Sequence, residues 1–419
     1  MRRIDRSAIP QPVLSLCETL RARGHRAWVV GGCVRDYLLG RAVADWDLCT
    51  TAQPDAVMKL FRKTVATGLA HGTVTVVLDR EHYEVTTLRG EGAYTDGRRP
   101  DHVVYLDDIA ADLERRDFTV NAIAYDPLED AVEDPFGGQR DLSAGMLRAV
   151  GDPRARFRED GLRILRGCRF VSALGFSLEP ATEAAMGEAL DVFARVSPER
   201  VRDEWLKTLK TPAPSRAFEV MRRVGVLARV LPEATRVEAS RYAAALAAVD
   251  RLAPDPVLRL AALLRPYLVE APDPRQATEQ WMDAWRFSRD ERARVLRLVQ
   301  SPLVSTWPAG DAPTLRRRVR ALGLDALDDA TALAAALDPA GAASVREAVD
   351  GALGTRPALN TRDLAVDGAG LQRHLGLGPS KRLGTLLGML LEDVLDTPAL
   401  NTEAALLARA RAHLDAMPT

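Results

Sequence analysis

The stretch Val30-Gly31-Gly32-Cys33-Val34-Arg35-Asp36-Tyr37-Leu38-Leu39-Gly40, followed by Asp45-Trp46-Asp47, decides the fold of this chain. The apolar residues before the two glycines predict a strand, and those after them have the spacing of a helix. Bare backbone amides at such a turn can approach a phosphate closely, and a helix N-terminus adds positive potential. The stretch therefore predicts a phosphate-binding turn at Gly31 and Gly32, with Arg35 one helical turn further on.

Two carboxylates follow this turn. If Asp45 and Asp47 lie on a strand, both side chains face the same side of it. They repel each other unless a cation lies between them, and Mg²⁺ prefers such oxygen ligands together with substrate phosphates. Glu84, in a strand-like run where Glu is disfavoured, is a weaker candidate for a third ligand. The alternatives are a solvated strand edge for the Asp pair and an outward-facing side chain for Glu84.

Composition and charge limit the class of protein. Of 419 residues, 47% are hydrophobic and 27% are charged, as in folded proteins with a sizeable core. Fifty-seven basic residues stand against 58 acidic ones, which excludes a uniformly basic nucleic-acid coat but leaves room for a local basic face. Four cysteines without a CxxC pair favour a reduced cytoplasm. Without an apolar signal segment or a run of about 18 apolar residues, we expect a cytoplasmic protein.

The composition of the chain changes near residue 145. Short β-rich runs precede this point, at residues 27–30, 73–78, 82–88 and 102–106. After it, Ala, Leu and Arg recur at helical spacing. We therefore expect an α/β head at residues 1–145, followed by a long all-α remainder. We divide this remainder into residues 146–210, 211–310 and 311–419, which we call the neck, the body and the tail.

Two neighbouring helical segments carry an excess of positive charge. Residues 148–170 contain seven arginines and three acids, and residues 195–229 contain nine basic residues and four acids. Solvated helix faces would explain either run by itself. Their position directly after the head favours a groove for nucleic acid.

A second cluster, Arg115-Arg116-Asp117, lies near the end of the head. The two guanidinium groups offer forked donors for triphosphate or ribose oxygens. Asp117 can accept from a ribose hydroxyl or hold those arginines, and Asn121 lies four residues later, one helical turn away. A surface ion-pair cluster is the alternative for this motif.

A third cluster, Asp160, Arg163 and Arg166, is spaced by three residues. At about 100° per residue these side chains would fall within one arc of a helix. The alternative is an i, i+3 salt bridge, which would stabilise a helix by only about 0.2–0.5 kcal/mol.

Taken together, these motifs resemble the head of the class II tRNA nucleotidyltransferases and the related bacterial poly(A) polymerases. The resemblance starts with Gly-Gly-x-Val-Arg-Asp-x-Leu-Leu-Gly and Asp-x-Asp, and residues 67–74 resemble the tRNA-specific branch. It continues with 115–122, with the turn motif Asp134-Pro-Phe-Gly-Gly138, and with 158–163. Residues 363–381 resemble the family's tail more weakly.

The resemblance implies a fold and an activity. The fold is a polymerase-β-like nucleotidyltransferase head with a mixed sheet, followed by an all-α neck, body and tail. The activity is template-independent addition of CCA to the 3′ end of tRNA, from CTP and ATP, with two Mg²⁺ ions on Asp45 and Asp47. The implied partners are nucleoside triphosphates and the acceptor arm and elbow of tRNA, with no membrane and no stable protein partner.

The resemblance also assigns roles to the clusters. It places Asp160 and Arg163 on the Watson–Crick edge of the incoming base. Cytosine and adenine both present an amino donor beside a ring acceptor, which suits a carboxylate and a guanidinium. Uracil and guanine present the reverse edge and would leave the carboxylate unsatisfied, at about 1–3 kcal/mol. The remaining nucleotide-binding candidates are Gly31, Gly32, Arg35, Arg116, Asp117, Asn121 and Arg166.

The segment from Arg89 to Pro100 holds three glycines and several charges, which predicts a loop. In the family such a loop is implied in switching the pocket from C to A, and an ordinary surface loop is the alternative. The candidate switching residues are Arg89, Glu91, Tyr94, Arg98 and Arg99.

Some members of the family carry a His-Asp phosphohydrolase domain, and here Arg265 and Pro266 occupy the comparable place. The six histidines form no metal-spaced cluster, so we predict no phosphohydrolase activity. Three other functions stay open: an A-adding enzyme that completes tRNA-CC, a poly(A) polymerase, and an RNA-binding protein without catalysis. The intact Asp45 and Asp47 argue against the last.

Overall fold

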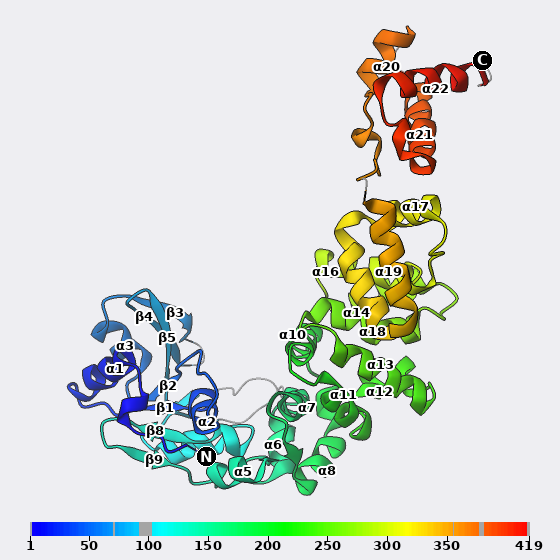
Figure 1. The fold of residues 1–419 in the computed structure, drawn as a ribbon. Helices are drawn as coiled ribbons and strands as arrows, with labels where there is room; N and C mark the ends of the chain where they lie inside the picture. Colours follow the sequence, from blue (N-terminus) through cyan, green and yellow to red (C-terminus); the bar gives the residue numbers. More distant parts are fainter. Residues whose placement is uncertain (1, 70–71, 92–102, 355, 377–380, 417–419) are drawn as a thin grey trace. The chain divides into compact units, whose positions relative to one another are not determined.

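The computed structural model describes residues 2–69, 72–91, 103–354, 356–376 and 381–416 (Figure 1). The chain forms two compact units, Met1–Arg236 and Val237–Thr419. The expected boundaries at 145, 210 and 310 divide the chain more finely and remain predictions.

A seven-stranded mixed sheet forms the centre of the head, with strand order β3-β4-β5-β2-β1-β8-β9. Its strands are β1 (Ala27–Val30), β2 (Leu48–Thr50), β3 (Thr64–Gly68), β4 (Thr73–Leu78), β5 (Glu81–Thr87), β8 (Ala124–Asp126) and β9 (Ala131–Glu133). All neighbours are antiparallel except β2 and β5, which are parallel. The expected mixed sheet and the runs 27–30 and 73–78 are therefore confirmed.

Short helices surround this sheet (Figure 1). They are η1 (Arg6–Ala8), α1 (Gln11–Arg21), α2 (Gly32–Leu38), α3 (Pro54–Leu60), α4 (Ile109–Glu114), η3 (Thr119–Asn121) and α5 (Gly138–Ala144). All four residues of β1 are buried because this strand lies near the middle of the sheet. Trp28 is fully buried and packs with Leu88 and Leu113, and each such side chain contributes about 1.5–3 kcal/mol.

One local expectation in the head is wrong, and a second is wrong in its first three residues. Asp45 and Asp47 do not lie on a strand, since β2 begins only at Leu48. The carbonyl of Asp47 nevertheless accepts from the amide of Val30 at 3.1 Å, which holds this residue beside β1. The predicted loop from Arg89 begins instead with β6 (Arg89–Glu91), which pairs with β7 (Val103–Tyr105).

The rest of the first unit is almost entirely helical. Its helices are α6 (Pro153–Glu159), α7 (Leu162–Leu174), α8 (Pro180–Glu188), α9 (Leu190–Phe193), α10 (Pro198–Leu209), α11 (Pro214–Arg223), α12 (Leu227–Val230) and η4 (Pro232–Thr235). One departure from an all-α neck is a short parallel pair, β10 (Met146–Leu147) with β11 (Ser177–Leu178). It ties the residues after the head to the end of α7.

The second unit is helical throughout its described residues. Its helices are α13 (Ala239–Arg251), α14 (Pro256–Leu268), α15 (Pro274–Ala284), α16 (Arg289–Gln300), η5 (Val304–Thr306), α17 (Ala312–Leu322), η6 (Leu324–Ala326), α18 (Leu327–Leu337), α19 (Pro339–Leu353), η7 (Thr361–Asp363), α20 (Gly368–Leu375), α21 (Lys381–Asp396), η8 (Pro398–Leu400) and α22 (Glu403–Ala416). Arg265 is buried and donates to the carbonyls of Leu298 and Val299, so it joins α14 to the end of α16. In the part of the chain that the structure describes, every helix is too short or too polar to cross a bilayer.

Candidate active site

A cavity of about 790 Å³ in the first unit brings most of the predicted residues together. It lies where the end of β1, the start of α2, β5 and one side of α7 meet. Its described lining includes eight cationic side chains and four carboxylates, a composition that suits a polyanion. The cations are Arg35, Arg89, Arg115, Arg116, Arg163, Arg166, Arg169 and Lys207, and the carboxylates are Asp45, Asp47, Glu84 and Asp117.

The glycine turn lies at one wall of this cavity. Gly31 has φ 74°, a conformation that glycine adopts without strain. A Cβ atom there would lie 2.8 Å from Nη1 of Arg116, so a larger residue would displace this guanidinium group. The amide of Gly31 donates to the carbonyl of Ile123 at 3.1 Å, so it is not bare as predicted. The amides available to a phosphate are those of the first turn of α2, starting at Gly32.

The carboxylates lie close enough to perturb one another. Asp47 is open to solvent through the cavity, yet the surrounding protein reduces its hydration, and this burial raises its pKa to about 6. The charges of Glu84 and Asp45 raise it further, and Arg116 opposes them. Such crowding is relieved by a divalent cation, and carboxylate oxygens are the ligands that Mg²⁺ takes. The residues therefore fit this ion.

Glu84 lines the cavity but does not complete a cluster of three ligands. Across residues 2–69, 72–91, 103–354, 356–376 and 381–416, no three His, Cys, Asp or Glu side chains form a group that could hold a metal ion. The predicted metal site is thus a carboxylate pair that depends on substrate oxygens for its remaining ligands. The role of Glu84 as a ligand remains a prediction.

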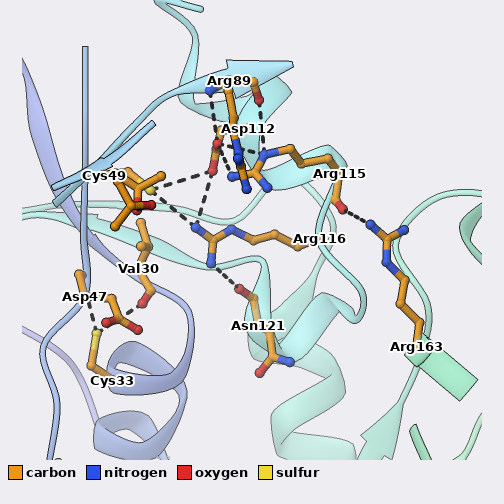
Figure 2. Close-up of polar contacts among 12 residues, drawn as sticks. Val30, Cys33, Asp47, Cys49, Arg89, Asp112, Arg115, Arg116, Asn121 and Arg163 are labelled. Carbon is orange, nitrogen blue, oxygen red and sulfur yellow. Dashed lines mark hydrogen bonds and ion pairs between the residues drawn. The ribbon is translucent and has the colours of Figure 1, made fainter. Parts of the chain in front are cut away.

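Both arginines of the Arg-Arg-Asp motif are held by one buried carboxylate, which the sequence analysis missed. Nη2 of Arg115 lies 2.7 Å from Oδ1 of Asp112, and Nη2 of Arg116 lies 3.3 Å from Oδ2 (Figure 2). Burial would raise the pKa of Asp112, but the two arginines outweigh it and lower the pKa below its ordinary value. The sequence signal for this contact was the spacing, since Asp112 lies three residues before Arg115 and four residues before Arg116.

Five side chains form a closed circuit from α2 through η3 to α7. Asp117 accepts from Nδ2 of Asn121 at 3.0 Å and from Nη2 of Arg166 at 2.7 Å. Oδ1 of Asn121 accepts from Arg35 at 2.5 Å. The guanidinium groups of Arg35 and Arg166 both lie over the ring of Phe170, at 5.3 and 5.4 Å from its centroid. The circuit fixes Arg35 and Arg166, which both line the cavity. Its aromatic member, Phe170, was not predicted from the sequence.

Asp117 is almost fully buried within this circuit. Burial by itself would raise the pKa of its carboxyl. The charge of Arg166 and the hydrogen bond from Asn121 outweigh this effect and lower the pKa to about 2. Asn121 lies on a 3₁₀ turn and not one α-helical turn after Asp117, but the shorter turn still brings the two side chains into contact.

The expectation that Asp160, Arg163 and Arg166 share one helix is wrong. Helix α6 ends at Glu159, and α7 begins at Leu162. The break lies at Asp160, whose φ of −149° and ψ of 109° are extended, and a Cβ atom at the following Gly161 would lie 2.6 Å from the backbone of Phe193. Only a glycine permits this contact between α7 and the end of α9.

The members of this third cluster consequently have different partners. Asp160 accepts from the amide of Leu162 at 3.0 Å and from Arg200 at 2.7 Å, and it is not among the described residues that line the cavity. Arg163 lines the cavity, donates to the carbonyl of Arg115 at 2.9 Å and pairs with Glu159.

The remaining predicted residues are placed as follows. Arg89 lines the cavity, and the backbone of Arg89 and Glu91 belongs to β6. Tyr94, Arg98 and Arg99, predicted for the switching loop, lie outside the described residues. In the turn motif, Asp134 accepts from the amides of Gly138 and Gln139 and caps the start of α5.

The basic excess after the head is partly neutralised within the first unit. Arg154 pairs with Glu188 at 2.6 Å, and Arg223 pairs with Glu183 at 2.7 Å. Arg169 bonds Glu204 at 2.7 Å. Binding of tRNA along these helices remains a prediction. Because of these ion pairs, fewer arginine charges are available for it than the sequence suggests.

We predict that Asp117→Asn lowers the free energy of unfolding by about 2 kcal/mol at pH 7. The folded pKa near 2 lies below the unfolded value near 4. The stability from Asp117 is therefore complete above pH 4 and is lost as the pH falls toward 2. Urea unfolding of both proteins between pH 7 and pH 3 measures this, and Arg166→Gln should reproduce the trend. A difference that does not shrink toward pH 3 would contradict the prediction.

Comparison with known families places this chain. The model of the family described as "Poly A polymerase head domain" matches residues 27–148. A second model, described as "Probable RNA and SrmB- binding site of polymerase A", matches residues 175–237. The first match covers the sheet, the glycine turn, the pair Asp45 and Asp47, and the Arg-Arg-Asp motif.

Known relatives extend the similarity along the whole chain. The CCA-adding enzyme of Lactobacillus johnsonii is 34% identical over 394 residues, 94% of this chain and 95% of that one. The CCA-adding enzyme of Geobacillus sp. is 47% identical over 216 residues, 52% of this chain and 53% of its own. The crystal structure of the Bacillus stearothermophilus CCA-adding enzyme with CTP has a TM-score of 0.78 at 29% identity, covering 98% of this chain and 100% of that one. The chain therefore belongs to the family of the CCA-adding enzymes, which are tRNA nucleotidyltransferases.

Proposed function

We propose that this protein adds CCA to the 3′ end of tRNA from CTP and ATP, without a nucleic-acid template. The observation that carries the proposal is the single cavity in which a glycine turn, a carboxylate pair and a cluster of arginines meet. Two relatives matched over most of their length support it, since both are CCA-adding enzymes and one was crystallised with CTP. The cytoplasm is the compartment that we propose for this reaction.

The proposed reaction is attack of the tRNA 3′-hydroxyl on the α-phosphorus of the incoming nucleotide. A bond forms between the 3′-oxygen and phosphorus, and the bond to the bridging oxygen breaks, so that pyrophosphate leaves with the electron pair. The hydroxyl proton passes to water. Mg²⁺ bound by Asp45 and Asp47 would lower the pKa of the hydroxyl and neutralise triphosphate charge.

The residues of the chain position the triphosphate in this proposal. The first amides of α2 and the guanidinium of Arg35 face its phosphates. Arg116 is fixed by Asp112, and Arg166 by Asp117, so neither needs to be ordered when the nucleotide binds. Negative charge collects on the departing pyrophosphate during the reaction. The cations around the cavity therefore stabilise the transition state.

Base selection by Asp160 and Arg163 requires a rearrangement. Arg163 already lines the cavity, whereas Asp160 is held by Arg200 and is not among the described lining residues. We propose that Asp160 exchanges this bond for the amino group of cytosine or adenine. The backbone bond from Leu162 would keep the carboxylate in place during the exchange.

Loss of the carboxylate pair tests the activity. With tRNA that ends before CCA, Asp45→Ala and Asp47→Ala should each lower incorporation of C at least about a thousandfold, because the metal site is lost. Binding of tRNA should change less than twofold. The matched control is Glu81→Gln, an exposed acid on the strand of Glu84, which should retain wild-type incorporation. Wild-type rates in both Asp variants would refute the metal assignment.

Discrimination among the four nucleotides tests the selection proposal. In Asp160→Ala, the preference for CTP and ATP over UTP and GTP should fall by about ten- to a hundredfold, because no carboxylate is then left unsatisfied by the wrong base. Single-nucleotide incorporation with each triphosphate measures this ratio. Arg200→Gln should keep the preference, since it removes only the resting partner of Asp160. An unchanged ratio in Asp160→Ala would exclude this residue from base selection.

A further inference from the structure

The segment that carries the carboxylate pair has no regular backbone structure of its own. Residues 41–47, between α2 and β2, are described in full and form neither helix nor strand. The end of this segment is held by the carbonyl of Asp47, which accepts from the amide of Val30 on β1 at 3.1 Å. The positions of Asp45 and Asp47 therefore depend on how the start of the segment is fixed.

Two backbone bonds fix the start of the segment to α2. The amide of Gly40 donates to the carbonyl of Tyr37 at 2.9 Å. The amide of Arg41 donates to the carbonyl of Asp36 at 2.8 Å. These bonds end the helix and join the backbone of Arg41 to it. The first turn of this helix faces the phosphates of the nucleotide in the proposed function.

The side chain of Arg41 reaches from this segment to the end of α7. Its Nη1 atom donates to the carbonyl of Ala173 at 3.0 Å, and its Nη2 atom donates to the carbonyl of Leu174 at 3.2 Å. Both carbonyls belong to the last turn of α7, where backbone oxygens have no partner within the helix. A cation at this end also interacts favourably with the helix dipole. One exposed arginine thus joins the carboxylate-bearing segment to α7.

The first half of α7 is held separately by the Arg-Arg-Asp motif. Arg163 donates to the carbonyl of Arg115 at 2.9 Å. Arg166 pairs with Asp117 at 2.7 Å. The 13 residues of α7 span about 20 Å, and Arg41 holds the opposite end. A helix that is held near both ends cannot easily tilt or slide relative to the carboxylate pair.

We infer that Arg41 is a positioning residue for nucleotide addition, an inference that rests on the proposed function. Arg41 is not among the described residues that line the cavity, so it acts through the two elements that it joins. It sets the distance between the carboxylate pair, beside which the 3′-hydroxyl reacts, and α7, whose arginines hold the nucleotide. Small errors in such a distance slow the reaction, because transfer requires closely aligned reacting atoms.

The cations that face the triphosphate keep their own partners when Arg41 is removed. Arg35 stays bonded to Asn121. Arg116 stays paired with Asp112. We therefore expect that loss of Arg41 lowers the rate of transfer and leaves the affinity for the nucleotide nearly unchanged.

The same end of α7 offers a matched control. Arg216, on α11, donates from its Nη2 atom to the carbonyl of Phe176 at 3.2 Å, two residues beyond the end of α7. This bond also joins an arginine to a backbone carbonyl at that end, but it comes from α11 and not from residues 41–47. Arg216→Gln therefore removes a comparable bond and leaves the contact of Arg41 in place.

Single-turnover addition of C, with saturating tRNA that ends before CCA, separates positioning from simple capping. In Arg41→Ala the maximal rate should fall about tenfold, whereas Kd for CTP without tRNA should stay within twofold of wild type. Arg41→Lys, whose ammonium group can reach one carbonyl, should lose no more than about threefold. Arg216→Gln should keep the wild-type rate. Arg41→Gln replaces Arg41→Ala, with the same expected direction, if the latter unfolds below the assay temperature.

Hydrogen exchange gives a readout that is independent of catalysis. The amides of residues 41–47 should exchange faster in Arg41→Ala than in wild type, because the segment opens more easily without its contact to α7. Arg216→Gln should leave their exchange unchanged. A wild-type rate in Arg41→Ala, or an equal loss of rate in Arg216→Gln, would overturn the inference, since Arg41 would then only cap α7. Failure of the wild type to extend any tRNA would instead overturn the proposed function.

Discussion

The pairing of one fully buried carboxylate, Asp112, with both Arg115 and Arg116 supports the geometry of the active site. Arg116 lies directly behind Gly31, where a Cβ atom would come within 2.8 Å of its guanidinium. Its charge also acts on Asp47. The glycine turn, the carboxylate pair and the arginines are therefore one unit. Removing Asp112 would leave two cations in a poorly hydrated site, which would lower the free energy of unfolding by about 3–5 kcal/mol.

A division of charge along one sheet face follows from this unit. On one side of the carboxylates lie cations fixed by Asp112, by Asp117 and by the ring of Phe170. On the other side lies a row of uncharged side chains that ends at Val65. The cationic side suits a triphosphate.

Features set by local sequence could be predicted, and those set by distant contacts could not. The strand 27–30 and the glycine turn depend on neighbouring residues and were found, whereas the turn at Asp134 was expected only from the family resemblance. The break between α6 and α7 was missed because residue spacing reveals neither the extended backbone of Asp160 nor the close approach of Gly161 to the backbone of Phe193, thirty-two residues later. The spacing by three residues therefore predicted one helix for Asp160 and Arg163, whereas Asp160 lies in the break before α7. Phe170 was missed because an apolar residue in a helix gives no sign that three arginines surround its ring.

The measurement that tests this account most directly is extension of three matched tRNAs, ending before CCA, after C and after CC. CTP and ATP are supplied singly and together with Mg²⁺, and the products are read at single-nucleotide resolution. The account predicts that all three tRNAs are extended to the same CCA end and no further. Extension of only the CC-ended tRNA, by one A, would contradict full CCA addition and make the protein an A-adding enzyme. Unlimited addition of A would make it a poly(A) polymerase.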